Sequence, residues 1–208
     1  MARAYDASAR ELSALETRRR ILDAARDLML GGGYRAMTIV ELAERAQVST
    51  QTVYNSVGGK GVVVKAVYDM LLAGDDDPVP MSERPEFLAI RDAPDLETWA
   101  TAYAAWTRSI LVRVGPLLGA LLEHGPAGDP VLEKLVASMD RERRAGNDNS
   151  LRRLLPRATT RSKAVDAVWT LTSPEVYDRL VTKRGWSHRA YEAWLARQLH
   201  TCVEPRRR

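Results

Sequence analysis

The segment from Thr38 to Lys60 constrains the fold of this chain more than any other stretch. It reads TIVELAERAQVSTQTVYNSVGGK and holds two short helical patterns joined by a tight turn. Apolar positions recur where the two helices and their turn would meet: Leu42, Ala43, Ala46, Val48, Val53 and Tyr54. Ala43 is small enough for the helices to approach closely where they cross. The segment therefore predicts a helix-turn-helix.

The second helix of this pair carries the side chains of functional interest. Ser49 precedes it and is suited to be its N-cap, because a serine oxygen accepts an otherwise unbonded backbone N–H. Thr50, Gln51, Thr52 and Asn55 would face outward, and all four are short, polar and uncharged. Such side chains can read base edges and contact phosphates. The alternative is an ordinary helical hairpin of an all-α protein.

Composition limits the remaining possibilities. The 208 residues include 31 Lys+Arg and 27 Asp+Glu, so a net charge of +4 permits nucleic-acid binding without arguing for it. The single cysteine, Cys202, fits a reducing cytoplasm and excludes a zinc site built on cysteines. Residues 1–20 are charged, and no apolar run is long enough to span a membrane, so we expect neither a signal peptide nor a membrane segment.

Helical periodicity without strand-like alternation predicts an all-α chain. We expect a polar, mobile arm at residues 1–16, then a helix capped by Thr17 and stopped by Gly31–Gly33. With the helix-turn-helix and a fourth helix over Lys60–Ala73, this forms a domain at residues 17–73. The acidic, proline-containing run Asp75–Pro80 marks the boundary.

The sequence pattern of residues 74–203 predicts a larger helical domain, and a basic tail follows at residues 204–208. The expected helices cover Asp95–Arg113, with a break or kink at Pro116, and a helix from Pro130 that is capped by Asp129 and ends before Gly146. Further helices are expected at Asn149–Leu155, Lys163–Leu171, Val176–Lys183 and Ser187–Val203.

Taken together, the glycine-stopped helix, the ELAERA and VSTQTVYNSVGGK segments and the apolar helix that follows resemble the TetR family of bacterial transcriptional regulators. The second half is similar to a subgroup of that family in the segments at Asp75–Glu86, Ala164–Val181 and Arg184–Leu195. The resemblance implies an N-terminal three-helix DNA-binding domain and a C-terminal domain for effector binding and dimerisation. It also implies a cytoplasmic homodimer whose partners are double-stranded operator DNA and a small molecule.

The resemblance assigns DNA contacts to specific positions. The implied set is Thr38, Ser49, Thr50, Gln51, Thr52, Tyr54, Asn55 and Lys60. Gln51 is long enough to pair with N6 and N7 of adenine, whereas hydroxyls such as that of Tyr54 suit phosphate oxygens. For Tyr54, the alternative is a core residue with its hydroxyl at the surface.

Three positions depart from the family pattern. Gln47 stands where a glycine is usual, and a left-handed backbone there would cost about 1 kcal/mol. Val57 replaces a usual phenylalanine, which removes roughly 1–3 kcal/mol of apolar burial. Gly59 replaces a usual serine and leaves the fourth helix without a capping side chain. These departures predict a softer DNA-binding domain.

The C-terminal assignments are a pocket and an interface. An effector pocket would be lined by Trp99, Tyr103, Trp106, Ile110, Leu118, Leu122, Met139, Arg143 and Trp169, with Arg143 or His124 as polar anchors. Aromatic residues at this spacing can equally form core. A dimer interface would use Val168, Trp169, Val176, Leu180, Trp194 and Leu195. These residues can alternatively cap the monomer's own core.

Enzymatic and metal-binding motifs are absent from the sequence. His124, His188 and His200 lack metal-site spacing, and no P-loop, GxSxG or HExxH motif occurs. We therefore expect no catalysis, metal or cofactor. The resemblance implies a repressor released by a small apolar or amphipathic effector. Two alternatives are a DNA-binding protein of this fold without a ligand, and a helical ligand-binding or enzymatic module that does not bind an operator.

Overall fold

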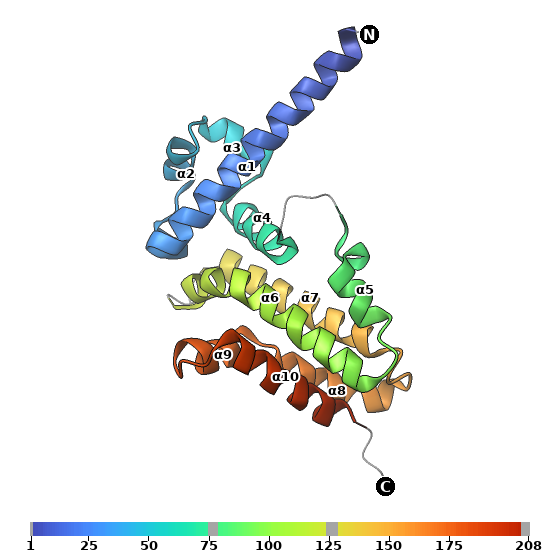
Figure 1. Ribbon diagram of the computed structural model, residues 1–208. Helices are drawn as coiled ribbons and strands as arrows, with labels where there is room; N and C mark the ends of the chain where they lie inside the picture. The colour runs from blue at the N-terminus through green and yellow to red at the C-terminus, as the bar shows by residue number, and fades with distance from the viewer. Residues whose placement is uncertain (1, 75–78, 124–128, 205–208) are drawn as a thin grey trace. The chain divides into compact units, whose positions relative to one another are not determined.

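The computed structural model describes residues 2–74, 79–123 and 129–204, and every regular element among them is helical (Figure 1). The chain divides into two compact units. The first comprises Met1–Ala73 and Pro116–Leu135, and the second comprises Gly74–Gly115 and Val136–Arg208. The chain passes from the first unit to the second between residues 73 and 74. The inclusion of Pro116–Leu135 in the first unit was not expected.

The first helix is longer than its sequence pattern indicated. Helix α1 runs Ala2–Ala36, so the backbone is helical through the predicted mobile arm and Thr17 does not begin the helix. Alanine, arginine, leucine and glutamate dominate residues 2–16, and all four favour helix. The predicted glycine stop is real, because Gly33 breaks the helical backbone with φ 76° and ψ 173°.

Three short helices complete the first unit: α2 (Ile39–Arg45), α3 (Thr50–Ser56) and α4 (Lys60–Ala73). α1 packs against all three, and α2 packs against α3. Their shared core consists of fully buried side chains: Ile21, Ala25, Met29, Met37, Leu42, Val53, Val63, Val64 and Val67. The predicted helix-turn-helix core is therefore confirmed for Leu42, Ala43, Ala46 and Val53, with Val48 half-buried in the turn, but Tyr54 is exposed and lies outside it.

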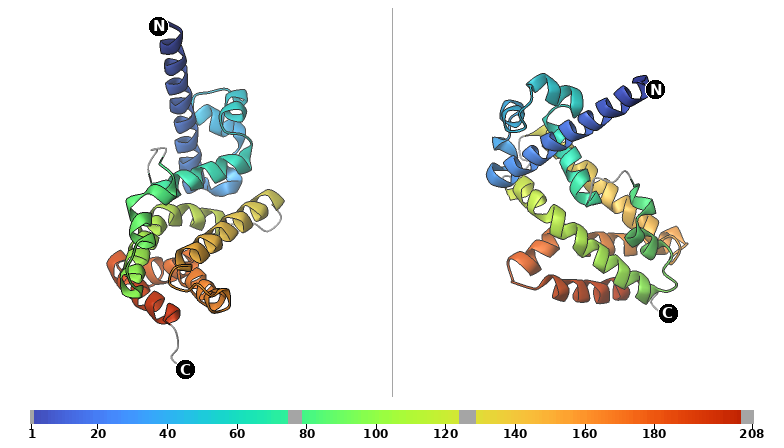
Figure 2. Two further views of the ribbon diagram at one scale, coloured as in Figure 1. Left: turned by 90° about the vertical axis from the view of Figure 1, so that its right-hand side faces the viewer. Right: turned by 45° about the horizontal axis from the view of Figure 1, so that its top comes forward.

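The second unit contains the short 3-10 turn η1 (Met81–Glu83) and α5 (Pro85–Arg91) before its long helices. It holds the first part of α6 (Leu96–Glu123), most of α7 (Pro130–Leu151) and all of α8 (Ala158–Leu171). It ends with α9 (Pro174–Tyr177), the π-turn η2 (Asp178–Thr182) and α10 (His188–Val203). Figure 2 shows α8 and α10 lying side by side.

The sequence predicted a break or kink at Pro116 and a helix end before Gly146, but neither residue ends its helix. α6 continues through Pro116 to Glu123, and α7 continues through Gly146 to Leu151. A glycine inside a helix costs about 1 kcal/mol, which tertiary packing can offset. Here Asn147 and Leu151 become buried on the far side of Gly146.

The predicted cap of α7 is confirmed, and two further helices have serine caps that were not predicted. The Asp129 carboxylate accepts from the N–H groups of Val131 (3.0 Å) and Leu132 (3.1 Å) at the start of α7. Ser173 accepts from Val176 N–H at 3.3 Å and Ser187 from Ala190 N–H at 3.1 Å. Each is a local contact within three residues, which is the kind of contact that sequence can predict, as it did for Asp129.

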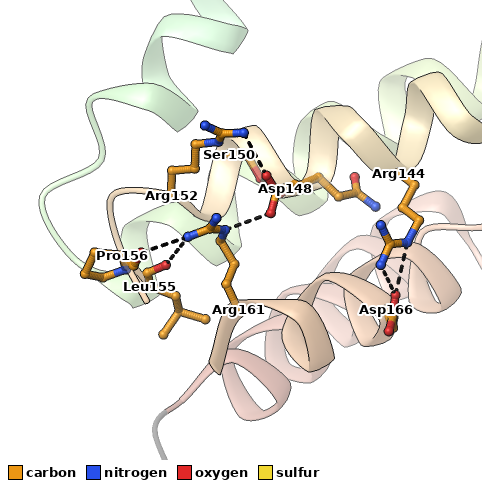
Figure 3. Close-up of polar contacts among 9 residues, drawn as sticks. Arg144, Asp148, Ser150, Arg152, Leu155, Pro156, Arg161 and Asp166 are labelled. Carbon is orange, nitrogen blue, oxygen red and sulfur yellow. Dashed lines mark hydrogen bonds and ion pairs between the residues drawn. The ribbon is translucent and has the colours of Figure 1, made fainter. Parts of the chain in front are cut away.

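The connection from α7 to α8 is held by arginine (Figure 3). Arg161 of α8 donates to the Asp148 carboxylate at 2.7 Å and to the Leu155 carbonyl at 2.8 Å. Arg152 also donates to Asp148, at 3.1 Å. These hydrogen bonds lower the pKa of the Asp148 carboxyl from its ordinary value, and the bond from Arg161 has the largest effect. The end of α7 is therefore anchored to α8.

Two residues of the predicted dimer interface belong to the monomer's own core. Val168 and Leu195 have no exposed surface, because they pack inside the second unit. Their assignment to a partner-facing surface is therefore wrong. Trp169, Val176, Leu180 and Trp194 retain part of their surface.

Candidate nucleic-acid interface

The exposed face of α3 is polar and carries no charge. Thr50, Gln51, Tyr54 and Asn55 are exposed, and their spacing places them on one side of the helix. Val53 lies on the opposite side and is fully buried. Hydrogen-bonding groups therefore cover the outer face, while one apolar anchor holds the helix to the core.

Hydroxyl caps fix the starts of both helices of the motif. Thr38 Oγ1 accepts from Glu41 N–H at 3.1 Å, and Ser49 Oγ accepts from Thr52 N–H at 3.0 Å. Ser49 Oγ also lies 2.8 Å from Thr52 Oγ1. Thr38 and Ser49 are exposed, so the structure brings their hydroxyls to the surface at two helix N-termini. Helix N-termini favour anions such as phosphate.

Gln51 and Asn55 form one hydrogen-bonded pair on α3. Gln51 Nε2 donates to Asn55 Oδ1 at 2.9 Å, across one turn of the helix. The hydrogen bond holds the Gln51 amide against the next turn of α3 on the exposed face. A side chain restrained in this way loses less rotamer entropy when it binds.

Tyr54 does not lie on the inner face of α3, where its spacing beside Val53 had placed it. Its side chain is 53% exposed, and its ring lies near the Cα of Gly59. The helix is only seven residues long, so one apolar position is enough to anchor it. This exposure argues against the alternative in which Tyr54 is a core residue, and the phosphate contact implied by the resemblance stays a prediction.

Lys60, the first residue of α4, takes part in contacts that the sequence did not predict. Its Nζ lies 4.1 Å from the centre of the Tyr34 ring. The Tyr34 hydroxyl is hydrogen-bonded to Asp129. Burial is the main cause that raises the pKa of Tyr34, and the Asp129 carboxylate raises it further. Burial lowers the pKa of Lys60, and the Asp129 charge opposes that shift. Lys60 therefore already interacts with Tyr34 and Asp129 of the protein itself.

The start of α7 comes close to the start of α4 in this unit. A Cβ on Gly61 would lie only 2.6 Å from Val131 Cγ1, so glycine is needed for the approach. Asp129 both caps α7 and interacts with Tyr34 and Lys60. The bond from Leu132 N–H is the first cause that lowers the Asp129 pKa. Sequence reasoning found the cap but not its long-range partners.

A second missed contact supports the end of α3. Arg18 Nη1, on α1, donates to the Ser56 carbonyl at 2.8 Å. The C-terminal carbonyls of a helix lack partners within the helix, and a cation there is favourable. The two residues lie far apart in sequence, so no local pattern indicated the contact.

The three departures identified in the sequence have clear local structures. Gln47 adopts φ 55°, which confirms that this turn position needs the left-handed conformation. Val57 is the half-buried C-cap of α3. The Gly59 carbonyl accepts from Val63 N–H at 3.0 Å, so Gly59 precedes α4 without a capping side chain.

The predicted effector-pocket residues are not all brought together. Trp99, Tyr103 and Trp106 form a continuous aromatic row, with ring centres 4.9 Å and 5.5 Å apart. Met139 is buried in the second unit, Ile110 is half-buried there, and Leu118 belongs to the first unit. The Leu122 side chain and His124 lie outside the described residues.

Arg143 does not offer a free cation to an effector. Its Nη1 donates to the Trp169 carbonyl at 2.5 Å, and its Nη2 donates to Asp140 at 2.9 Å. The guanidinium also lies 4.9 Å from the Trp169 ring centre. Trp169 Nε1 in turn donates to Asp140 at 3.0 Å, so this trio is a structural contact between α7 and α8.

Comparison with known proteins places the interface in a recognised domain. Residues 21–67 match the model of bacterial regulatory proteins of the tetR family. The uncharacterized HTH-type transcriptional regulator YdeS of Bacillus subtilis (strain 168) is 30% identical over 118 residues, covering 57% of this chain and 54% of YdeS. YvkB of the same organism, also an uncharacterized HTH-type regulator, is 45% identical over 51 residues, covering 24% of this chain and 27% of YvkB.

The chain thus spans about half of YdeS and about a quarter of YvkB. A solved structure from Mesorhizobium loti MAFF303099, assigned to the TetR family, aligns with a TM-score of 0.48 and 16% identity. The alignment covers 91% of this chain and 94% of that one. No helix within residues 2–74, 79–123 and 129–204 has the length and apolar character needed to cross a bilayer.

Proposed function

We propose that this chain, whose residues 21–67 match the tetR-family model of bacterial regulatory proteins, represses transcription as a cytoplasmic homodimer bound to operator DNA. A small molecule bound to the second unit would release it. The observation that carries the proposal is the exposed polar face of α3, framed by two hydroxyl-capped helix N-termini.

Each part of this face has a chemical role in the proposal. Gln51, restrained by its hydrogen bond to Asn55, reads a base edge in the major groove, since a glutamine amide can pair twice with adenine. Tyr54 and the capping hydroxyls of Thr38 and Ser49 contact phosphates, which set the position of the helix on the duplex. Thr50, Thr52 and Lys60 complete the backbone contacts.

The coupling between effector and DNA would run along α7. This helix begins at the Asp129 contact with Tyr34 and Lys60, and it continues from the first unit into the second. A ligand that favours one position of α7 would bias α4 and, through it, the spacing of the two recognition helices. The shift cannot exceed the difference in the ligand's affinity for the two states.

Homodimerisation supplies the second recognition helix. Trp169, Val176, Leu180 and Trp194 retain exposed surface, and Trp186, 36% exposed, packs against Trp194 with ring centres 6.1 Å apart. An apolar surface of this kind suits a two-fold interface, and two-fold symmetry matches a palindromic operator. Sedimentation at micromolar protein concentration tests this part: we expect a dimer, and a monomer would exclude it.

A gel-shift titration against the DNA upstream of the chain's own gene tests operator binding. We expect a shift that survives excess random duplex in the wild-type protein and is weakened in Gln51→Ala. Lys134→Ala serves as a matched control, because Lys134 is exposed on α7 and lies outside the proposed interface. If random duplex abolishes every shift, the protein does not recognise an operator in this DNA.

A further inference from the structure

Few side-chain contacts hold helix α3 in its unit. The helix is seven residues long, about 10 Å, and Val53 is its fully buried side chain. Ser56 and Val57, at its end, are half-buried. A single apolar anchor near the middle of a short helix leaves the helix free to tilt about that point. The angle of α3 therefore depends on what holds its two ends.

The two ends of α3 are held in different ways. At its start, the Val48 N–H donates to the Ala43 carbonyl at 2.9 Å, which ties the turn to α2 through the backbone. The Ser49 cap beside it is local to α3. At its end, the Arg18 guanidinium of α1 donates to the Ser56 carbonyl at 2.8 Å. A side chain 38 residues away in sequence therefore holds this end of the helix.

The bond from Arg18 lies where α3 needs a donor. The last backbone bonds of the helix, from the N–H groups of Val57 (2.9 Å) and Gly58 (3.1 Å), both end on the Val53 carbonyl. Carbonyls beyond that point lack partners within the helix, and a cation there is favourable. Residues 11–16 of α1 are exposed, whereas Arg18 is half-buried, and α1 passes beside α3 (Figure 1). A charged donor also makes a stronger hydrogen bond than a neutral one.

We propose that Arg18 is a positioning residue for base reading, which sets the angle of α3 through the Ser56 carbonyl and does not itself bind DNA. The proposal rests on the proposed function, in which Gln51 reads a base. Gln51 is bonded to Asn55, the neighbour of Ser56, so a tilt at the end of the helix moves both amides. A recognition group must be held within about 0.5 Å of its productive position. Loss of the bond from Arg18 should therefore reduce discrimination between sequences more than affinity for DNA in general.

A phosphate contact is the competing role for Arg18. A guanidinium carries several N–H donors, so donation to Ser56 leaves others for DNA. The two roles differ in their salt dependence. Loss of a phosphate contact weakens binding to all sequences and lowers the slope of log affinity against log salt by about one. Loss of a positioning contact weakens operator binding and leaves that slope unchanged.

Three substitutions on α1 separate these roles in the full-length protein. Arg18→Met removes the donors, Arg18→Lys keeps the charge and a donor at similar reach, and Arg20→Met removes the same charge from an exposed neighbour. Anisotropy titrations at several salt concentrations compare the DNA upstream of the chain's own gene with a random duplex. We expect Arg18→Met to weaken binding to the upstream DNA about tenfold, as loss of one base contact would, and to change binding to the random duplex by no more than about twofold.

The other two variants should discriminate between the duplexes as the wild type does. Arg18→Lys should recover most of the preference for the upstream DNA, and Arg20→Met should keep the wild-type ratio of the two affinities. Equal losses of Arg18→Met on both duplexes, with a shallower salt slope, would make Arg18 a phosphate contact and overturn the proposal. Unchanged discrimination in Arg18→Met would overturn it as well.

Gln51→Ala in the Arg18→Met background tests whether the two residues act together. If Arg18 acts by placing Gln51, the double variant should lose little more affinity for the upstream DNA than the weaker-binding single variant, because coupled residues are not additive. A merely structural role, in which Arg18→Met only lowers stability, predicts that the two losses multiply. That outcome would contradict the proposal.

Amide hydrogen exchange without DNA tests the contact by itself. We expect the α3 amides to exchange about tenfold faster in Arg18→Met than in the wild type, with the α2 amides unchanged, because the end of α3 has lost its bond to α1. Unchanged exchange in α3 refutes only this inference. If the wild type binds the upstream DNA no better than the random duplex, the operator proposal fails, and hydrogen exchange still decides whether Arg18 orients α3.

Discussion

The ammonium group of Lys60 lies 4.1 Å from the centre of the Tyr34 ring, which joins the first residue of α4 to the segment that follows the Gly33 break. Asp129 acts on both side chains, through a hydrogen bond to Tyr34 and its charge on Lys60. A residue expected to hold DNA phosphate is therefore held by a carboxylate at the start of α7. Phosphate and Asp129 would compete for the same cation.

Replacing Asp129 with asparagine should raise DNA affinity. Asparagine can still cap α7, but it no longer attracts Lys60. We expect operator affinity to rise about two- to fivefold, because surface ion pairs are weak. Gel shift at fixed salt measures this, since affinity for DNA depends strongly on salt. Unchanged or lower affinity, with the unfolding midpoint of the wild type, would show that Asp129 does not compete with DNA.

Gln51→Ala and Asn55→Ala should weaken binding in different ways. Loss of Gln51 should cost about 1–3 kcal/mol on the operator and relax the preference at one base position. Loss of Asn55 should weaken operator and random DNA alike, because Asn55 contacts the backbone. Binding to a panel of single-base operator variants decides the matter. Equal effects of both substitutions on operator and random DNA would exclude base reading by Gln51.

Val57→Phe should stabilise the DNA-binding unit. Val57 is half-buried where the family carries a larger side chain, so a phenylalanine should add about 1–2 kcal/mol of apolar burial. DNA affinity should stay the same or rise, because a unit that is already ordered loses less conformational entropy when it binds DNA. Thermal unfolding and gel shift measure both effects. A lower midpoint together with weaker binding would mean that buried neighbours such as Met29 and Met37 already fill the space.

Gln47→Gly should also stabilise the turn of the motif. The left-handed conformation at φ 55° costs a non-glycine residue about 1 kcal/mol. Glycine removes this strain but gains freedom in the unfolded chain, so the net increase in unfolding free energy should be about 0.5 kcal/mol. Gln47→Ala keeps the strain and is the control. Equal midpoints for the glycine and alanine variants would show that the turn is not strained.

The sequence predicted what depends on local contacts. The caps at Ser49 and Asp129 and the left-handed turn at Gln47 were predictable because each rests on residues within three or four positions. The core of the helix-turn-helix was predictable because its apolar residues follow the helical period, although Tyr54 lies outside it.

Long-range contacts explain what sequence patterns missed. Three contacts join residues far apart in sequence: the bond from Arg18 to Ser56, the approach of Asp129 to Lys60 and the bond from Arg143 to the Trp169 carbonyl. Periodicity shows which residues are apolar but not which neighbour covers them, so Val168 and Leu195 were assigned to a partner instead of their own core. The helix through Gly146 likewise depends on the burial of Leu151.

The central claim is that two copies of α3 read an operator, and selection from a random duplex library tests it most directly. Wild-type protein should enrich a palindrome whose half-site centres lie about 34–36 Å apart, one turn of duplex. Gln51→Ala should enrich the same palindrome with a relaxed preference at one position in each half-site. Enrichment of no sequence over the starting library, or of a site without two-fold symmetry, would contradict the account.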